Sequence, residues 1–113
     1  MTLQEREARA CAIIDSMAEE LCDVSLYLHD NPELGLDEHK AVKVINQFLE
    51  THNFTSQVGL TDLPELQTAL RGDYNGNAQH KIAFLGEYDA LPELGHGCGH
   101  NLIAMMSLGA AIA

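Results

Sequence analysis

The segment from Asn101 to Ala113 constrains the fold more than any other part of this sequence. It reads NLIAMMSLGAAIA and contains no charged side chain. Apolar side chains fall on nearly every face of the helix that this segment would form, and such a helix is stable only where protein surrounds it. We therefore expect other elements to cover it, and we expect the chain to be the beginning of a larger domain whose remaining elements lie beyond Ala113.

The rest of the chain alternates between helical and extended patterns. Apolar residues recur at helical spacing over residues 3–29, and a second helix is expected over residues 37–51, with Asp37 as its N-terminal cap. Short strands are expected over residues 65–71 and 81–86, separated by a stretch of turn-forming residues, 72–80. This order of elements predicts an α/β fold. The buried face of the second helix is expected to comprise Val42, Ile45, Phe48 and Leu49.

The charge balance argues against two classes of partner. The sequence contains six Lys and Arg and seventeen Asp and Glu, which gives a formal net charge of −11 at pH 7. Nucleic acids and anionic membranes select clustered Lys and Arg, so we expect neither as a partner. The first residues lack the uninterrupted apolar stretch of a secretory signal, and no segment reaches the roughly 20 apolar residues of a membrane span. These features predict a cytoplasmic protein.

The three cysteines are expected to be reduced thiols, as is usual in the cytoplasm. Cys11 and Cys22 lie on one predicted helix, about 16 Å apart along its axis. A disulfide joins Cα atoms within about 7 Å, so these two cannot pair. We expect both to lie in the core, because a lone cysteine on an apolar helix usually behaves as a small apolar residue.

The stretch HGCGH, residues 96–100, contains candidate metal-binding side chains. In a locally extended backbone, residues two apart point to the same side, so His96, Cys98 and His100 would face one point. The intervening glycines let the backbone bend without clashes from Cβ atoms. Imidazole nitrogen and thiolate sulfur are donors that zinc and similar ions prefer, so the pattern favours a metal site. A glycine-rich turn that binds no metal is the alternative on these residues alone.

Two carboxylates precede this stretch. Asp89 follows the second predicted strand, and ligands of open α/β sheets gather at the carboxyl ends of strands. A carboxylate there can orient a ligating histidine or bind the metal itself. Glu87 would project to the same side if the strand continues.

Two motifs, in the correct order and at the correct spacing, resemble one enzyme family. GEYDALPELGHGCGHN, residues 86–101, resembles the core signature of the metal-dependent amidohydrolases and peptidases related to aminoacylase, carboxypeptidase G and hippurate hydrolase. It is most similar to the branch of aminobenzoyl-glutamate hydrolase and β-alanyl dipeptidase. LHDNPELGLDEHKA, residues 28–41, matches the N-terminal motif of the family, and TALRG, residues 68–72, fits the strand between them. The resemblance covers nearly the whole chain.

The resemblance implies a fold and a set of site residues. Residues 1–113 would be the N-terminal part of a three-layer α/β catalytic domain of the zinc-peptidase type. Cys98 and His100 match the two metal ligands of the motif, and Asp89 matches the aspartate that supports the metal site. Glu87 stands where the carboxypeptidase branch has a ligating histidine. His96 belongs to the motif but ranks below the other two as a ligand.

The resemblance also implies a reaction. Such an enzyme hydrolyses the amide bond of an N-acyl amino acid or a dipeptide, with zinc, manganese or cobalt as its metal. Its catalytic glutamate, its remaining ligands and the lid domain that forms a homodimer would all lie outside residues 1–113. We therefore expect this chain to be a fragment that is inactive alone. The alternative is a non-catalytic remnant that binds a metal or a partner.

Overall fold

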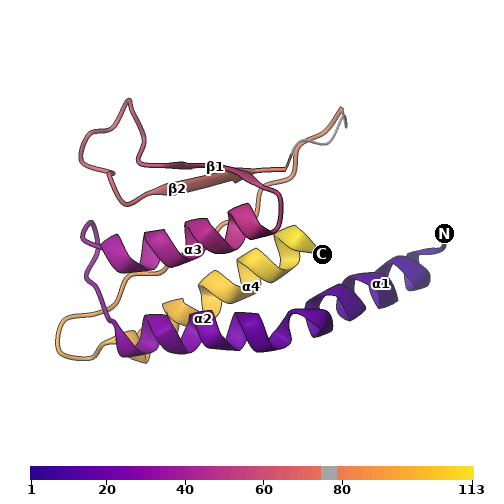
Figure 1. Ribbon diagram of the computed structural model, residues 1–113, viewed down its shortest axis with the longest axis horizontal. Coiled ribbons are helices and arrows are strands. Elements are labelled where there is room, and N and C mark those ends of the chain that lie inside the picture. The colour runs from indigo at the N-terminus through magenta and orange to yellow at the C-terminus, as the bar shows by residue number, and fades with distance from the viewer. Residues whose placement is uncertain (75–78) are drawn as a thin grey trace.

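The computed structural model describes residues 1–74 and 79–113. This part of the chain contains four α-helices, one short 3-10 helix and one two-stranded sheet, with the helices on one side of the strands (Figure 1). In chain order the elements are α1 (Leu3–Ser16), α2 (Ala18–Asp30), α3 (His39–Thr51), β1 (Thr55–Val58), β2 (Leu70–Asp73), η1 (His96–Cys98) and α4 (His100–Ile112). The mixed α/β content agrees with the prediction from the sequence.

The single helix expected over residues 3–29 is in fact two helices. The backbone leaves helical geometry at Met17, which has φ −114° and ψ 16° and whose side chain is buried. No glycine or proline lies near this position, so the sequence gives no local sign of the break. α1 contains no buried residue and extends away from the other helices (Figure 1). The break places Met17 in the core while most of α1 stays outside it.

The N-terminus of α3 is held by a residue that lies before the expected cap. The side chain of Asp37 makes no capping bond, so that prediction is wrong. The carboxylate of Glu33 instead accepts hydrogen bonds from the backbone N–H groups of Lys40 and Ala41, at 2.9 and 2.8 Å. A carboxylate in this position satisfies free amides of the first turn and lies at the positive end of the helix dipole. The turn that contains Glu33 is thereby fixed to α3.

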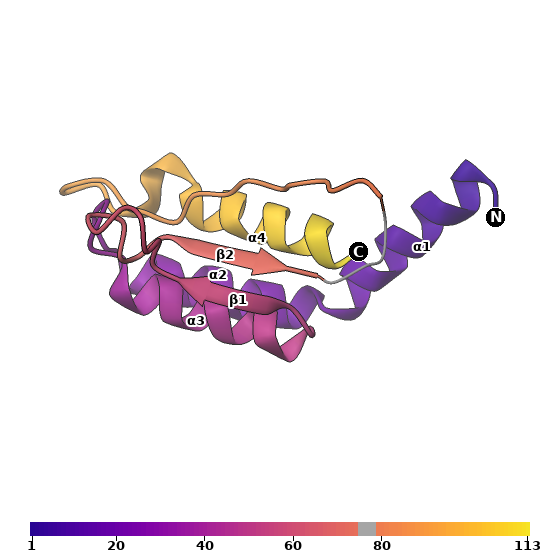
Figure 2. The ribbon, with the colours of Figure 1, turned by 90° about the horizontal axis from the view of Figure 1, so that it is seen from above.

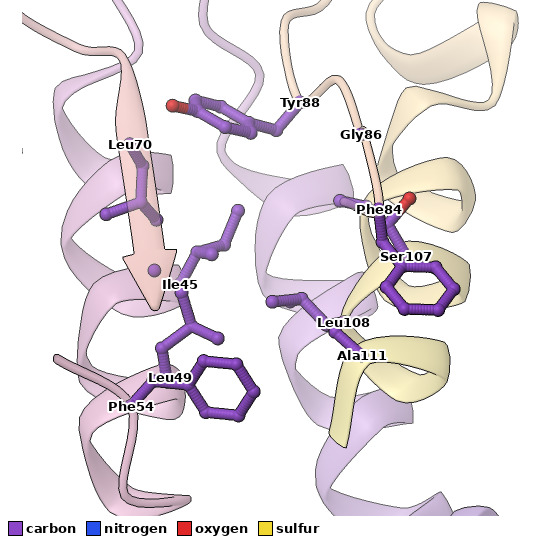
Figure 3. Close-up of a pocket in the computed structure, with 12 residues that line it drawn as sticks. Ile45, Leu49, Phe54, Leu70, Phe84, Gly86, Tyr88, Ser107, Leu108 and Ala111 are labelled. Carbon is purple, nitrogen blue, oxygen red and sulfur yellow. The ribbon is translucent and has the colours of Figure 1, made fainter. Parts of the chain in front are cut away.

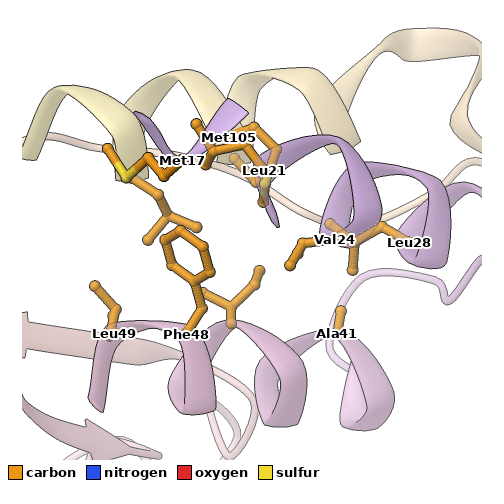
Figure 4. Close-up of a cluster of buried hydrophobic side chains, with 11 residues drawn as sticks. Met17, Leu21, Val24, Leu28, Ala41, Phe48, Leu49 and Met105 are labelled. Carbon is orange, nitrogen blue, oxygen red and sulfur yellow. The ribbon is translucent and has the colours of Figure 1, made fainter. Parts of the chain in front are cut away.

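The core lies where α2, α3 and α4 meet (Figure 4). The predicted buried face of α3 is confirmed, because all four of its expected residues are buried. The expectation that Cys11 and Cys22 lie in the core is wrong, since both are exposed free thiols. Position 22 falls outside the buried stripe of α2. That stripe consists of Leu21, Val24, Ser25 and Leu28.

Helix α4 is covered on one side only. Met105 and Leu108 are buried against the other helices, whereas Leu102 and Met106 are exposed. The expectation that protein surrounds this helix is therefore not met within the chain. Despite its apolar composition, α4 is not a candidate membrane span, and none of the described helices is long and apolar enough to cross a membrane.

The two strands form an antiparallel pair, in which Thr55 lies opposite Asp73 and Val58 opposite Leu70. The sequence did not predict β1. It placed β2 too early, at residues 65–71, because β2 begins only at Leu70 and ends at Asp73. Gly59, which follows β1, has a positive φ. Its N–H donates to the Ala69 carbonyl at 2.7 Å and so extends the contact between the two strands by one position.

The segment 81–86 runs alongside α4 (Figure 2), but it pairs with no strand in the described part of the chain. The prediction of a strand at 81–86 is therefore wrong for this structure, because a strand exists only with a hydrogen-bonded neighbour. The expected turn over residues 72–80 includes residues 75–78, which lie outside the described residues.

The two adjacent methionines of α4 provide a matched test of this core. Met105 is 7% exposed and Met106 is 72% exposed. We expect Met105→Ala to lower the free energy of unfolding by about 2–5 kcal/mol, because it leaves a cavity among α2, α3 and α4. Met106→Ala should change it by no more than about 0.5 kcal/mol. Urea denaturation of both variants measures the difference, and equal effects would contradict the packing described for α4.

Candidate metal centre

The candidate site is built where the segment that follows residue 86 meets the start of α4. Ala90 fixes this segment, because its N–H donates to the carbonyl of Glu33 at 2.7 Å and Leu34 forms a parallel bridge with it. The Ala90 side chain is buried. Asp89 therefore stands next to a residue that is anchored to the turn before α3.

The HGCGH stretch is a tight turn and not an extended strand. Gly95 has φ 62°, residues His96–Cys98 form η1, and Gly99 has φ 81°, in the left-handed region that favours glycine. Leu91 and Gly95 exchange backbone hydrogen bonds of 2.9 and 3.0 Å just before the turn. The prediction that residues 96, 98 and 100 project to one side of an extended backbone is therefore wrong. The two glycines with positive φ turn the chain from the loop into α4.

Both ring nitrogens of His100 face carboxylates. Nδ1 lies 2.8 Å from Asp89 Oδ1 and 3.1 Å from the Asp89 carbonyl oxygen, and Nε2 lies 3.1 Å from Glu87 Oε2. The hydrogen bond to Asp89, helped by the negative charges of Asp89 and Glu87, raises the pKa of His100 above its ordinary value of 6.5 although partial burial opposes this. In the absence of another cation, the protonated ring is the form that this pair of carboxylates stabilises.

Cys98 lies close to the same aspartate. Its Sγ is 4.0 Å from the carbonyl oxygen of Asp89, which is at the limit of a weak thiol hydrogen bond, and its side chain is partly buried. The turn thus brings two of the predicted site residues, Cys98 and His100, to Asp89. Glu87 reaches the same histidine from the exposed side.

His96 is held apart from these contacts. It is 8% exposed, and its Nδ1 has no hydrogen-bond partner among the described residues. Burial lowers the pKa of His96, and the nearby rings of His29 and His100 lower it further, while Asp89 acts in the opposite direction. His96 is therefore a buried imidazole whose charged form is disfavoured by burial.

Two further residues hold the site region in place. Asn101, in the first turn of α4, is buried and donates from Nδ2 to Ser25 Oγ at 3.1 Å, which ties the start of α4 to α2. Glu33 anchors Ala90 as described above. Both lie within the two motifs, but their roles depend on contacts with residues distant in sequence, which the sequence does not display.

These residues do not form a complete metal site by themselves. Within residues 1–74 and 79–113, no three His, Cys, Asp or Glu side chains are grouped so that they could hold a metal ion. The nitrogen, sulfur and oxygen donors of His100, Cys98 and Asp89 nevertheless match the donor types that divalent zinc prefers. The residues present thus fit part of a metal shell.

The chain is similar to three hydrolases of known name. It is 37% identical over 97% of its length to Xaa-Arg dipeptidase of Mus musculus and 34% identical over 97% to Xaa-Arg dipeptidase of Homo sapiens. It is also 30% identical over 88% of its length to one of the subunits of p-aminobenzoyl-glutamate hydrolase from Escherichia coli. The chain is homologous to these hydrolases. The family resemblance of the two motifs is thereby confirmed.

The homology covers only part of each relative. The chain spans 27% of both Xaa-Arg dipeptidases and 24% of the aminobenzoyl-glutamate hydrolase polypeptide, which is about a quarter of their length. No protein-family model matches the chain.

Removal of the Asp89 carboxylate tests the geometry around His100. We expect Asp89→Asn to lower the pKa of His100, because the hydrogen bond to Asp89 is the largest cause of its raised value. Glu87→Gln should lower the pKa of His100 by a smaller amount. NMR titration of the His100 ring measures both variants, and a larger effect of Glu87→Gln would refute the assignment of Asp89 as the main partner.

The raised pKa of His100 also predicts how the stability of the fold changes with pH. Because the pKa of His100 is raised on folding, its contribution to stability is fully present below the unfolded-state value near 6.5. The contribution is lost as the pH rises through the folded-state pKa. Asp89→Asn should flatten this part of the pH dependence of unfolding.

Proposed function

We propose that this chain forms part of a metal-dependent hydrolase that cleaves the amide bond of N-acyl amino acids or dipeptides. The observation that carries the proposal is the convergence of Cys98, His100 and Asp89 in a chain homologous to a dipeptidase and to an aminobenzoyl-glutamate hydrolase. The relatives' names give the substrate class, and dipeptides with a C-terminal arginine are its first candidates.

In this proposal Cys98 and His100 hold a divalent ion, which is zinc, manganese or cobalt. When bound, the ion supplies Lewis acidity toward the scissile carbonyl. Asp89 has a supporting role, because its bond to Nδ1 fixes the tautomer and orientation of His100 and leaves Nε2 for the ligand position. Glu87 lies within 3.1 Å of that nitrogen. His96 ranks below the other two, since its ring is buried beneath the turn and touches neither of them by a hydrogen bond in the described structure.

The proposal extends to the whole enzyme. Residues 1–113 would belong to a three-layer α/β catalytic domain, with the general-base glutamate and the other metal ligands contributed from outside this chain. The complete protein would be a cytoplasmic homodimer, and the chain alone would have no hydrolase activity.

Metal binding is the direct test of the site. In a background in which Cys11 and Cys22 are serine, we expect Zn²⁺ binding, measured by titration calorimetry, to depend on Cys98 and His100. Asp89→Asn should weaken binding by roughly 10–100-fold, as is typical for loss of a supporting residue, and Cys98→Ser or His100→Gln should weaken it further. His39→Gln, an exposed histidine on α3, is the matched control and should bind as before. The same affinity in all variants would leave a glycine-rich turn that binds no metal.

Catalysis requires the complete protein. The product of the whole reading frame that contains this chain should release amino acids from Xaa-Arg dipeptides or N-acyl amino acids when loaded with zinc, manganese or cobalt. A chelator or Cys98→Ser should abolish release. A product that binds the metal but releases no amino acid from any of these substrates would refute the hydrolase proposal in favour of a metal-binding remnant.

A further inference from the structure

A chain of hydrogen bonds links three residues that the candidate metal centre does not use. The hydroxyl of Tyr88 donates to the backbone carbonyl of Thr68, and the hydroxyl of Thr68 donates to Oε2 of Glu38. Thr68 and Glu38 are 4% and 9% exposed, and Tyr88 is partly buried. The hydrogen bonds therefore run from the start of α3, through the residues before β2, to the residue that precedes Asp89.

The buried carboxylate of Glu38 strengthens this chain of hydrogen bonds. A carboxylate that leaves water requires hydrogen-bond donors, and a bond to an ionised acceptor is stronger than one between neutral groups. Among the described residues, the Thr68 hydroxyl is the only partner of the Glu38 side chain. The backbone of Glu38 is itself fixed by α3, because its carbonyl accepts the N–H of Val42 at 3.0 Å. Thr68 is thereby tied to the N-terminus of α3.

Tyr88 remains a hydrogen-bond donor at every physiological pH. Burial, and to a lesser extent the negative charge of Glu38, raise the pKa of Tyr88 to about 12. The ring extends from the segment 81–88 toward β2, with the hydroxyl oxygen at its far end (Figure 3). A backbone carbonyl only accepts, so the neutral phenol is the donor in its bond to Thr68.

Asp89, the next residue, is held on both sides. The side chain of Tyr88 is anchored before it, and the N–H of Ala90 after it donates to the carbonyl of Glu33 at 2.7 Å. Neighbouring residues of an extended segment such as this one point to opposite sides (Figure 2). With Tyr88 directed toward β2, Asp89 is directed toward the start of α4, where its Oδ1 lies 2.8 Å from His100 Nδ1.

We infer that Tyr88 is a positioning residue for the candidate site. Through Thr68 and Glu38, its hydroxyl fixes the direction in which Asp89 projects and thereby maintains the contact between Asp89 and His100. The consequence for metal binding rests on the proposed function. The positioning role itself rests only on these contacts.

Proton exchange at His100 tests this role without metal or substrate. A carboxylate only accepts, so Nδ1 of His100 carries the proton that faces Asp89. In NMR of the full chain labelled with ¹⁵N-histidine, we expect Tyr88→Phe to speed exchange of this proton with water by roughly two- to tenfold, the factor that one hydrogen bond contributes. Tyr74→Phe, which removes an exposed hydroxyl, should leave the rate unchanged. Equal rates in the two variants, or no slowly exchanging Nδ1 proton in the unaltered chain, would overturn the inference.

The backbone amide of Phe48 separates a local effect from a general loss of stability. Phe48 is 3% exposed on α3, so exchange of its amide reports opening of the core. Tyr88→Phe should change exchange at Phe48 by a smaller factor than exchange at the Nδ1 proton of His100. The same factor at both sites would mean that Tyr88 only stabilises the fold, and the positioning role would be wrong.

A double-mutant cycle tests the link through Thr68. Thr68→Val removes the hydroxyl that reaches Glu38, whereas Thr68→Ser retains one. We expect Thr68→Val to speed exchange at His100 as Tyr88→Phe does, and Thr68→Ser to keep the slow rate. The double variant should add little to either change alone, because both interrupt the same chain of hydrogen bonds. Effects that multiply would contradict the link. If Thr68→Val does not fold, as judged by circular dichroism, the comparison of Tyr88→Phe with Tyr74→Phe decides the question.

Zinc binding distinguishes a failure of this inference from a failure of the proposed function. In the background in which Cys11 and Cys22 are serine, Tyr88→Phe should weaken Zn²⁺ binding, but by less than Asp89→Asn, because the carboxylate is still present. Faster proton exchange at His100 in a chain that binds no zinc would support the positioning role and count against the metal site. Unchanged exchange in a chain that does bind zinc would refute the positioning role and leave the metal site standing.

Discussion

The rest of this structure depends on the double attachment of Glu33. Its carboxylate binds two backbone amides of the first turn of α3, while its carbonyl accepts the N–H of Ala90. One residue of the N-terminal motif thereby fixes a helix of the core and also the segment that carries Asp89. Charge-assisted bonds to a helix N-terminus are among the stronger hydrogen bonds in proteins, so they stabilise this attachment. The two family motifs are distant in sequence but act as one structural unit.

This attachment explains how a site can have a defined geometry although the sheet beside it is open. The segment 81–88 makes no strand pairing in the described residues, yet Asp89, immediately after it, is held through Ala90. Asp89 then orients His100, and Asn101 in the next position ties the same turn of α4 to Ser25 of α2. The site is supported from the helical side, so its local arrangement does not require the neighbouring strands.

The sequence predicted those features that local patterns determine. The buried face of α3 follows from apolar spacing, and the helix expected over residues 101–113 follows from its continuous apolar composition; both are present. The sequence did not predict the features that depend on contacts between residues far apart in the chain. The helix break at Met17 coincides with burial of that side chain in the core, and the exposure of Cys22 depends on which face of α2 meets its neighbours. The capping of α3 by Glu33 in place of Asp37 has the same cause, since it requires the fold of the intervening turn.

In the candidate site, too, the sequence predicted the residues but not the backbone geometry that brings them together. Residue types and spacing identified Asp89, Cys98 and His100, but an extended backbone was expected to bring them together, and the structure uses a 3-10 turn between two glycines with positive φ. In such a turn, neighbouring donors diverge, which is why His96 is buried below while Cys98 and His100 reach Asp89. A pattern of alternating donors can thus single out residues that lie close together in the structure while giving the wrong reason for their geometry.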